Sequence, residues 1–112
     1  MQNVQRASEI RGKTMLFRWT EGPTKGKTYE HVFHQDGTVD FHATDSTKEK
    51  GGGARPEYAA VRVADGVYAV SYLSKPYTLT AVLNFDDHQM VGFASDAKDW
   101  FPVKGTFEVV EE

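Results

Sequence analysis

Residues 27–42 read KTYEHVFHQDGTVDFH, and this stretch decides the fold. Apolar and polar side chains alternate on both sides of a central QDG, which is the pattern of two half-buried β-strands joined by a tight turn. The turn predicts a three-residue hairpin loop with Gly37 in the left-handed conformation. His34 should then lie opposite Thr38, and the register of the whole hairpin follows from that pair.

This register assigns each side chain of the hairpin to one of two faces, because neighbours along a strand point to opposite sides. We expect the aromatic face to point inward, and it carries Tyr29, His31, Phe33, Val39 and Phe41. The other face is mainly polar and carries Glu30, Val32, His34, Thr38, Asp40 and His42. On that face Glu30 and His42 should form an exposed cross-strand pair.

The two-residue period continues over most of the chain beyond residue 12 and is interrupted by turn signals at short intervals. It predicts eight strands, at residues 13–20, 27–34, 38–43, 57–64, 67–73, 78–85, 88–95 and 103–110. Short connections between successive strands favour an antiparallel up-and-down meander. Eight strands can close into a barrel that either fills its interior with side chains or holds one small ligand.

The first stretch is the exception to this period. NVQRASEIRG predicts a short N-terminal helix with Asn3 as its N-cap and Gly12 as its stop. A chain of 112 residues has the size of a single domain, which we assign to residues 1–112. The expected fold is therefore all-β, a single eight-stranded antiparallel barrel with one short helix before it.

Two more turns allow further registers to be predicted. ADGV, residues 64–67, favours a type I′ turn with Ala64 opposite Val67. An inward face of valines and tyrosines would follow, made of Ala59, Val61, Val63, Tyr68, Val70 and Tyr72. A third hairpin about Asp86 and Asp87 should carry a further apolar stripe of Leu79, Ala81, Leu83 and Phe85.

Residues 44–55 contain no aromatic and no branched aliphatic side chain, and they include three consecutive glycines. Loops of this length without their own structure usually belong to lids, portals or disordered segments. We predict a flexible portal loop at residues 44–56, with a plain linker as the alternative. Trp100 and Phe101 are expected to plug the other end of the barrel rather than to line its entrance.

Composition excludes several classes of function. Thirteen Lys and Arg stand against sixteen Asp and Glu, giving a net charge of −3 with both signs interspersed, so neither nucleic acid nor an anionic membrane is an expected partner. The chain has no cysteine for disulfides or thiolate metal sites, and its first ten residues lack an apolar signal core. A cytoplasmic location is the prediction. The oligomeric state stays open, with a homodimer as one option.

The predicted inner faces are rich in rings that carry a polar atom, namely Trp19, Tyr29, His31, Tyr68 and Tyr72. A buried Tyr or Trp needs a partner for its polar atom, so a purely structural core would use aliphatic residues instead. Such rings around a cavity suit a small ligand with an apolar body and one or two hydrogen-bonding groups. The sequence therefore predicts a protein that binds a small apolar or aromatic molecule.

Four strings in the same order support this interpretation: RGKTMLFRW, KTYEHVFHQDGTVDFH, DGVYAVSYLSKP and TLTAVLNFDDHQMVG. Together they resemble the MoaF-like and phenolic acid decarboxylase branch of the calycins, which are small lipocalin-like barrels. The resemblance covers roughly residues 12 to 95 and depends on the shared order and spacing of the strings. It implies an eight-stranded barrel with a ligand pocket.

The resemblance does not extend to the catalytic positions of the decarboxylases. Their two alternating tyrosines on the first strand correspond to Phe17 and Trp19 here, and their glutamate acid corresponds to Ser74 or Lys75. Arg55 is the one nearby candidate for their carboxylate-binding arginine. These differences argue against phenolic acid decarboxylation and favour a pocket of the MoaF-like kind.

The predicted ligand-binding residues are Phe17, Trp19, Tyr29, His31, Phe41, Arg55, Tyr68 and Tyr72. We assign no catalytic residue and expect no cofactor. The alternative is a small lyase or cyclase in the same pocket, with His31, Tyr68 and Tyr72 as acid–base groups and Arg55 as an anion clamp. A filled barrel that serves as an interaction module is the third option.

His31 also has a plainer interpretation, as a core histidine hydrogen-bonded to a neighbour. No metal site is expected from His31 and His34, because residues three apart on a strand point to opposite faces.

Overall fold

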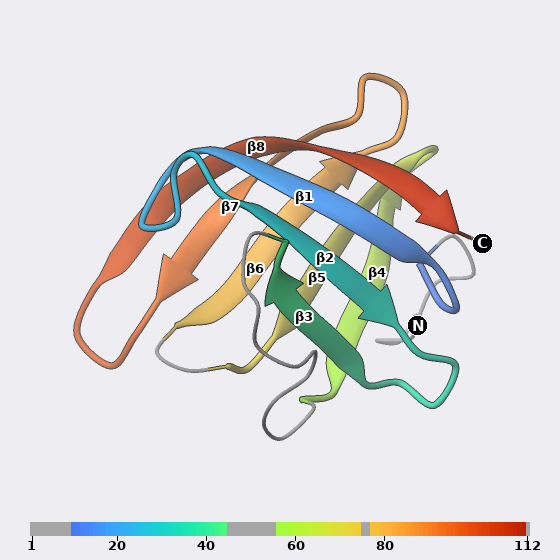
Figure 1. The fold of residues 1–112 in the computed structure, drawn as a ribbon, viewed down its shortest axis with the longest axis horizontal. Coiled ribbons are helices and arrows are strands. Elements are labelled where there is room, and N and C mark those ends of the chain that lie inside the picture. Colours follow the sequence, from blue (N-terminus) through green and yellow to red (C-terminus); the bar gives the residue numbers. More distant parts are fainter. Residues whose placement is uncertain (1–9, 45–55, 75–76, 112) are drawn as a thin grey trace.

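The computed structural model describes residues 10–44, 56–74 and 77–111 of the chain. In this part of the chain all regular structure is β, as predicted (Figure 1). The eight strands are β1 (Thr14–Glu21), β2 (Thr28–Phe33), β3 (Val39–Ala43), β4 (Tyr58–Ala64), β5 (Val67–Tyr72), β6 (Thr78–Asn84), β7 (Gln89–Ser95) and β8 (Trp100–Glu111).

The strands form one antiparallel sheet in the order β3-β2-β1-β8-β7-β6-β5-β4. Pairing of β1 with β8 joins the first and last strands, so the predicted meander curls into a lipocalin-like barrel (Figure 1). A seam lies between the edge strands β3 and β4, which the described residues join at one end only. There Thr38 bridges Glu57, and the Tyr58 amide donates to the Gly37 carbonyl over 3.0 Å.

The β2–β3 hairpin has the predicted register. His31 lies opposite Phe41, and the His34 amide donates to the Thr38 carbonyl over 2.8 Å. Gly37 has the expected positive φ of 91°. The outward face carries two histidine–carboxylate pairs. The pair of Glu30 and His42 was predicted, but both side chains are half-buried rather than exposed. His42 Nε2 lies 3.7 Å from Glu30 Oε1.

The β4–β5 hairpin corrects one prediction. Ala64 lies opposite Val67 as expected, but a type I′ turn needs positive φ at both central residues, and only Gly66 of the Asp65-Gly66 pair has one, 73°. A β-bulge between Arg62 and Ala64 instead places one extra residue in β4. The extra residue reverses which side chains of β4 point inward.

The inward residues of β4 are therefore Tyr58 and Ala60, each 1% exposed. Val63, expected inside, is 59% exposed, and Val61 pairs with Ala69 on the outward side. The faces predicted for β5 are unaffected, since its alternate residues are buried.

The last strand, β8, begins at Trp100 rather than at the predicted residue 103. Pro102 obscured this start, because proline cannot donate to a β-ladder. Pairing of β8 with β1 starts only at Lys104, so at Pro102 the edge of β8 that faces β1 forms no backbone hydrogen bonds. A proline is therefore tolerated there. Trp100 is 69% exposed, so the expectation that it plugs the barrel is wrong.

Two glycines let strands approach closely at inward positions of β7 and β8. A Cβ on Gly92 would lie 1.9 Å from the Thr80 carbonyl oxygen, and one on Gly105 would lie 2.2 Å from that of Arg18. Backbone occupies both places, so any side chain there would force neighbouring strands apart. Glycine at these two positions therefore permits the close approach of adjacent strands in the curled sheet.

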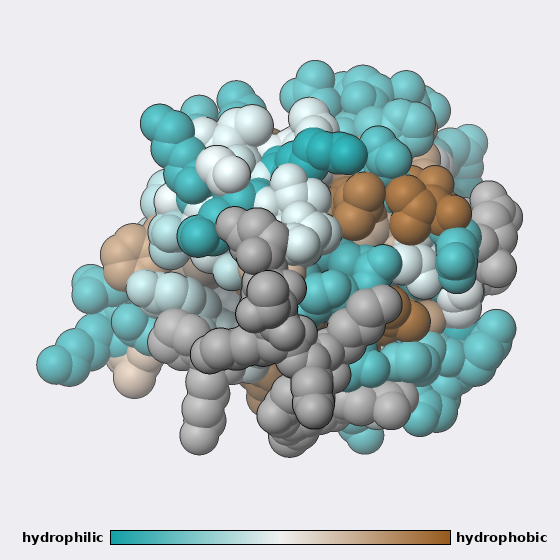
Figure 2. All heavy atoms as spheres, viewed as in Figure 1, coloured by the Kyte–Doolittle hydropathy of each residue, from teal (hydrophilic) through white to brown (hydrophobic). Residues whose placement is uncertain are grey.

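Most of the predicted N-terminal helix, residues 3–9, lies outside the described part of the chain, and residues 10–12, its expected end, form a turn. Most of the predicted portal loop, residues 45–55, also lies outside the described part. Within residues 10–44, 56–74 and 77–111 we find no helix with the length and apolar character needed to span a membrane. Most of the surface in this view is hydrophilic, with small groups of hydrophobic residues (Figure 2).

Candidate functional site

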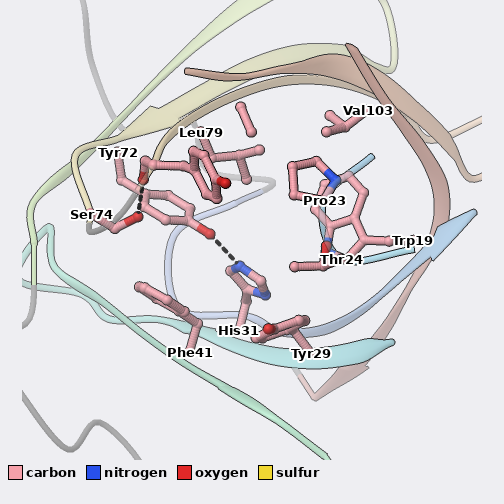
Figure 3. A pocket seen from close by; sticks show the side chains of 12 residues that line it. Trp19, Pro23, Thr24, Tyr29, His31, Phe41, Tyr72, Ser74, Leu79 and Val103 are labelled. Carbon is pink, nitrogen blue, oxygen red and sulfur yellow. Dashed lines mark hydrogen bonds between the residues drawn. The ribbon is translucent and has the colours of Figure 1, made fainter. Parts of the chain in front are cut away.

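A cavity of about 130 Å³ opens inside the barrel (Figure 3). Its wall is mostly apolar, and about the same volume accommodates a benzene molecule in an engineered protein cavity. The side chains that line it are Trp19, Pro23, Thr24, Tyr29, His31, Phe41, Tyr72, Ser74, Tyr77, Leu79, Ala94 and Val103. The space therefore fits a molecule the size of one six-membered ring.

Strand periodicity places the rings of this wall. Tyr29 and His31 are two residues apart on β2 and so point to the same side, with Phe41 of β3 directly opposite His31. Tyr72 comes from β5, on the facing wall of the barrel (Figure 3). Trp19, near the end of β1, and Tyr77, just before β6, complete the aromatic lining.

His31 and Tyr72 are joined by a hydrogen bond across the barrel, 2.6 Å between Nε2 and Oη (Figure 3). Aromatic rings hold the imidazole in place: Phe17 stacks on it with 4.0 Å between centroids, and Phe33 and Phe41 lie at 5.8 and 5.6 Å. The imidazole thus cannot turn without moving its neighbours. This bond agrees with the interpretation of His31 as a hydrogen-bonded core histidine.

The second nitrogen of His31 is different. Nδ1 is buried and has no well-formed hydrogen bond to any described residue. A buried polar atom without such a bond is rare in folded proteins and usually has a structural or functional cause. The hydrogen-bonding capacity of Nε2 is therefore satisfied by Tyr72, whereas that of Nδ1 is not satisfied by any described residue.

Both members of the pair are neutral at physiological pH. Burial lowers the pKa of His31 to about 3; the Tyr29 backbone acts in the opposite direction, and His42 adds slightly to the lowering. Burial, with a smaller contribution from Tyr29, raises the pKa of Tyr72. The pair is therefore suited to hydrogen bonding and poorly suited to proton transfer near neutral pH.

The described wall of the cavity has no Asp, Glu, Lys or Arg. Ser74 adds a polar group, but its hydroxyl already donates to the carbonyl of Tyr77. Among the described residues of the wall, a charged ligand group would lose its hydration without gaining a counter-charge, which is costly. Among residues 10–44, 56–74 and 77–111, no three His, Asp or Glu side chains gather as a metal site would need.

The structure brings together five of the eight residues predicted to bind a ligand. Trp19, Tyr29, His31, Phe41 and Tyr72 line the cavity. Phe17 lies one layer behind, against the imidazole of His31. Tyr68 points into the barrel but packs against Phe85, 5.7 Å between centroids, and is not part of the wall. Arg55 is outside the described residues.

The remaining residues of the wall were not among the predicted site residues. Pro23 and Thr24 come from the loop between β1 and β2, where no periodicity indicates direction. Leu79 belonged to a predicted apolar stripe, but nothing in the sequence distinguished it from the rest of the core. Tyr77 contacts Phe101, 5.6 Å between centroids, which places Phe101 beside the cavity wall.

Comparison with known proteins decides the family. The sequence matches the family described as the MoaF N-terminal domain over residues 2–99. The chain belongs to this family. The resemblance inferred from the four strings is thereby confirmed.

A solved structure similar to this MoaF-family chain is that of a candidate beta-lactamase from Burkholderia vietnamiensis. The TM-score is 0.73 and the identity 21%, over 95% of this chain and 100% of the other. At this identity the likeness concerns the fold alone. No curated protein matches the sequence.

Proposed function

We propose that this MoaF-family barrel binds a small, largely apolar or aromatic molecule in its interior cavity. The cavity itself, about 130 Å³ and lined mainly by rings and aliphatic side chains, is the observation that supports this function. Ligand pockets in proteins are typically concave and lined mainly by hydrophobic and aromatic side chains with a few polar groups, as this one is. The proposal places the protein among carriers or sensors, and its cytoplasmic location stays a prediction.

The hydrogen-bonded pair of His31 and Tyr72 is also compatible with a second function, that of a lyase or cyclase acting in the same cavity. Two observations weaken it. Tyr68, the third predicted acid–base group, does not line the cavity, and the pKa of His31, about 3, leaves no protonated imidazole at neutral pH. A loss of turnover in His31→Gln with ligand affinity retained would favour the enzyme; weakened binding alone would favour the carrier.

Native mass spectrometry of the purified protein, beside the same sample denatured, tests the proposed function. We expect a small molecule that remains bound to the folded chain and leaves on unfolding. Where the purified protein carries none, titration with toluene should show binding by calorimetry, because the cavity matches one ring in size.

A pair of variants localises the binding. Ala94 is 6% exposed and lines the cavity, so Ala94→Leu should fill part of the space and abolish toluene binding. Ala97 lies exposed in the loop between β7 and β8, so Ala97→Leu should bind toluene like the wild type. Equal binding by both variants, with both folded by circular dichroism, would contradict the proposal.

A further inference from the structure

The outer face of β5, β6 and β7 carries no charge. These three strands are neighbours in the sheet (Figure 1), and none of their residues is Asp, Glu, Lys or Arg. Each of the other five strands contains at least one such residue, and 26% of the whole chain is charged. Depletion of charge is what distinguishes the centre of a protein–protein interface from the rest of a protein surface.

The strand registers gather apolar side chains on this face. One row across β4, β5, β6 and β7 consists of Val61, Ala69, Val82 and Val91, each directly opposite the next. In the neighbouring row, Phe93 of β7 lies opposite Pro102 of β8. Val91 and Phe93 are 46% and 48% exposed. Contiguous exposed apolar patches on globular proteins commonly mark interaction sites.

The segments outside the described part of the chain have few side chains suited to cover this face. Residues 45–55 contain no aromatic and no branched aliphatic residue, and residues 1–9 contain only Met1 and Val4 as large apolar residues. A strongly charged partner would find no opposite charge here. A second copy of the same face has the matching character, apolar and uncharged.

The face is complementary to itself in size as well. When two copies pack face to face about a two-fold axis along β6, β7 of one copy lies over β5 of the other. Phe93 of β7 and Ser71 of β5 have the same height, because both pair with Thr80 of β6, and Val91 and Ala69 are matched in the same way. Large side chains of one copy therefore meet small ones of the other.

We propose that two copies of the chain associate through the outer face of β5, β6 and β7, as a homodimer with β6 at its centre. Five strands spaced about 4.8 Å apart and about 20 Å long project roughly 500 Å². This is below the roughly 800 Å² per partner of standard stable complexes. We therefore expect a reversible dimer with a Kd of about 1–100 µM. The interface lies outside the barrel and does not depend on a ligand in the cavity.

Sedimentation velocity of the full chain, from about 1 µM to about 1 mM, tests the dimer. We expect a rise from the mass of one chain to that of two. Val91→Lys should weaken association at least about tenfold, because an ammonium group would be buried in an apolar contact. Circular dichroism shows whether each variant is folded.

The matched control is Val110→Lys. Val110 is 41% exposed, close to the value for Val91, but it lies beyond the part of β8 that pairs with β7. The same substitution there should leave the Kd of the dimer unchanged within about twofold, since an exposed charge away from the contact loses little hydration.

A mixing experiment tests the facing of β7 against β5. Ala69→Glu alone should also weaken the dimer, since it buries a carboxylate. In an equimolar mixture of Val91→Lys and Ala69→Glu, the introduced ammonium group would face the introduced carboxylate across the interface. The mixture should therefore associate at least about tenfold more tightly than either variant alone.

Three results would overturn the inference. A monomer at every concentration would leave the face to the chain's own segments or to a different protein. A wild-type dimer that Val91→Lys does not weaken would place the interface elsewhere on the barrel. A mixture that associates no better than its components would contradict the two-fold arrangement about β6.

Discussion

His31 on β2 and Tyr72 on β5 meet across the barrel, with 2.6 Å between Nε2 and Oη, although 41 positions separate them in the sequence. The bond lies beside a cavity of about 130 Å³ and is enclosed by aromatic rings. It links two walls of the barrel that share no strand pairing. It therefore contributes both to the stability of the barrel and to the polarity of its interior.

Removing this bond should destabilise the protein. Tyr72→Phe leaves Nε2 of a fully buried imidazole without a partner, and we expect the free energy of unfolding to fall by about 1–3 kcal/mol. Urea denaturation followed by circular dichroism measures the change. Tyr58→Phe is the comparison, because the hydrogen bond from its hydroxyl to the His34 carbonyl is long, 3.4 Å. A larger loss for Tyr58→Phe than for Tyr72→Phe would contradict the account.

The pKa of His31 makes stability depend on pH. Because burial lowers this pKa from 6.5 to about 3, the unfolded chain binds a proton that the folded chain does not between these pH values. This contribution to stability is complete above pH 6.5 and is lost progressively as the pH falls toward 3. His31→Gln should flatten that slope in urea unfolding curves between pH 7 and pH 4. An unchanged slope would show that His31 does not govern the acid response.

Part of this architecture could be predicted from local sequence. The QDG turn fixed the β2–β3 register, and the two-residue period then placed Tyr29, His31 and Phe41 on one inward face. Those relationships span a few residues, so the local sequence was enough to predict them. The partnership of His31 with Tyr72 depends on the closure of the whole barrel, and no local pattern contains it.

The same limit explains why Tyr68 and Tyr72 differ. Both point inward from β5, but they lie at different heights along the barrel, and only Tyr72 reaches the cavity. Height depends on the stagger between strands around the barrel, which alternation in a single strand does not reveal. Likewise ADG is compatible with more than one kind of hairpin turn, so the bulge that moved Val63 outward left no clear sign in the sequence.

The bulge in β4 has its own test. Val63 is 59% exposed, whereas Val70 of β5 is 2% exposed in the core. Val63→Thr should change the free energy of unfolding by less than about 0.5 kcal/mol. Val70→Thr should cost about 1–3 kcal/mol, because a hydroxyl is buried without a partner. A similar cost at both positions would mean that Val63 lies inside, as strict alternation predicts.

Gly92 provides a test of the curled sheet. Its φ is not in the left-handed region, so the cost of Gly92→Ala would come from the clash of the new Cβ with backbone of β6. We expect a loss of about 1–3 kcal/mol or failure to fold. Gly26→Ala is the matched comparison, because Gly26 has φ of 86° but open space around it, and its cost should stay near about 1 kcal/mol. Equal stability of Gly92→Ala and wild type would contradict the close approach.

The central claim is that a small ring compound occupies the interior of the barrel. Its most direct test is a measurement of intermolecular nuclear Overhauser effects between phenol and the methyl groups of the protein. We predict contacts to the methyls of Leu79 and Val103, which line the cavity, and none to Leu73, which is 72% exposed. Contacts confined to Leu73 and other surface methyls, or no contacts at saturating phenol, would contradict the claim.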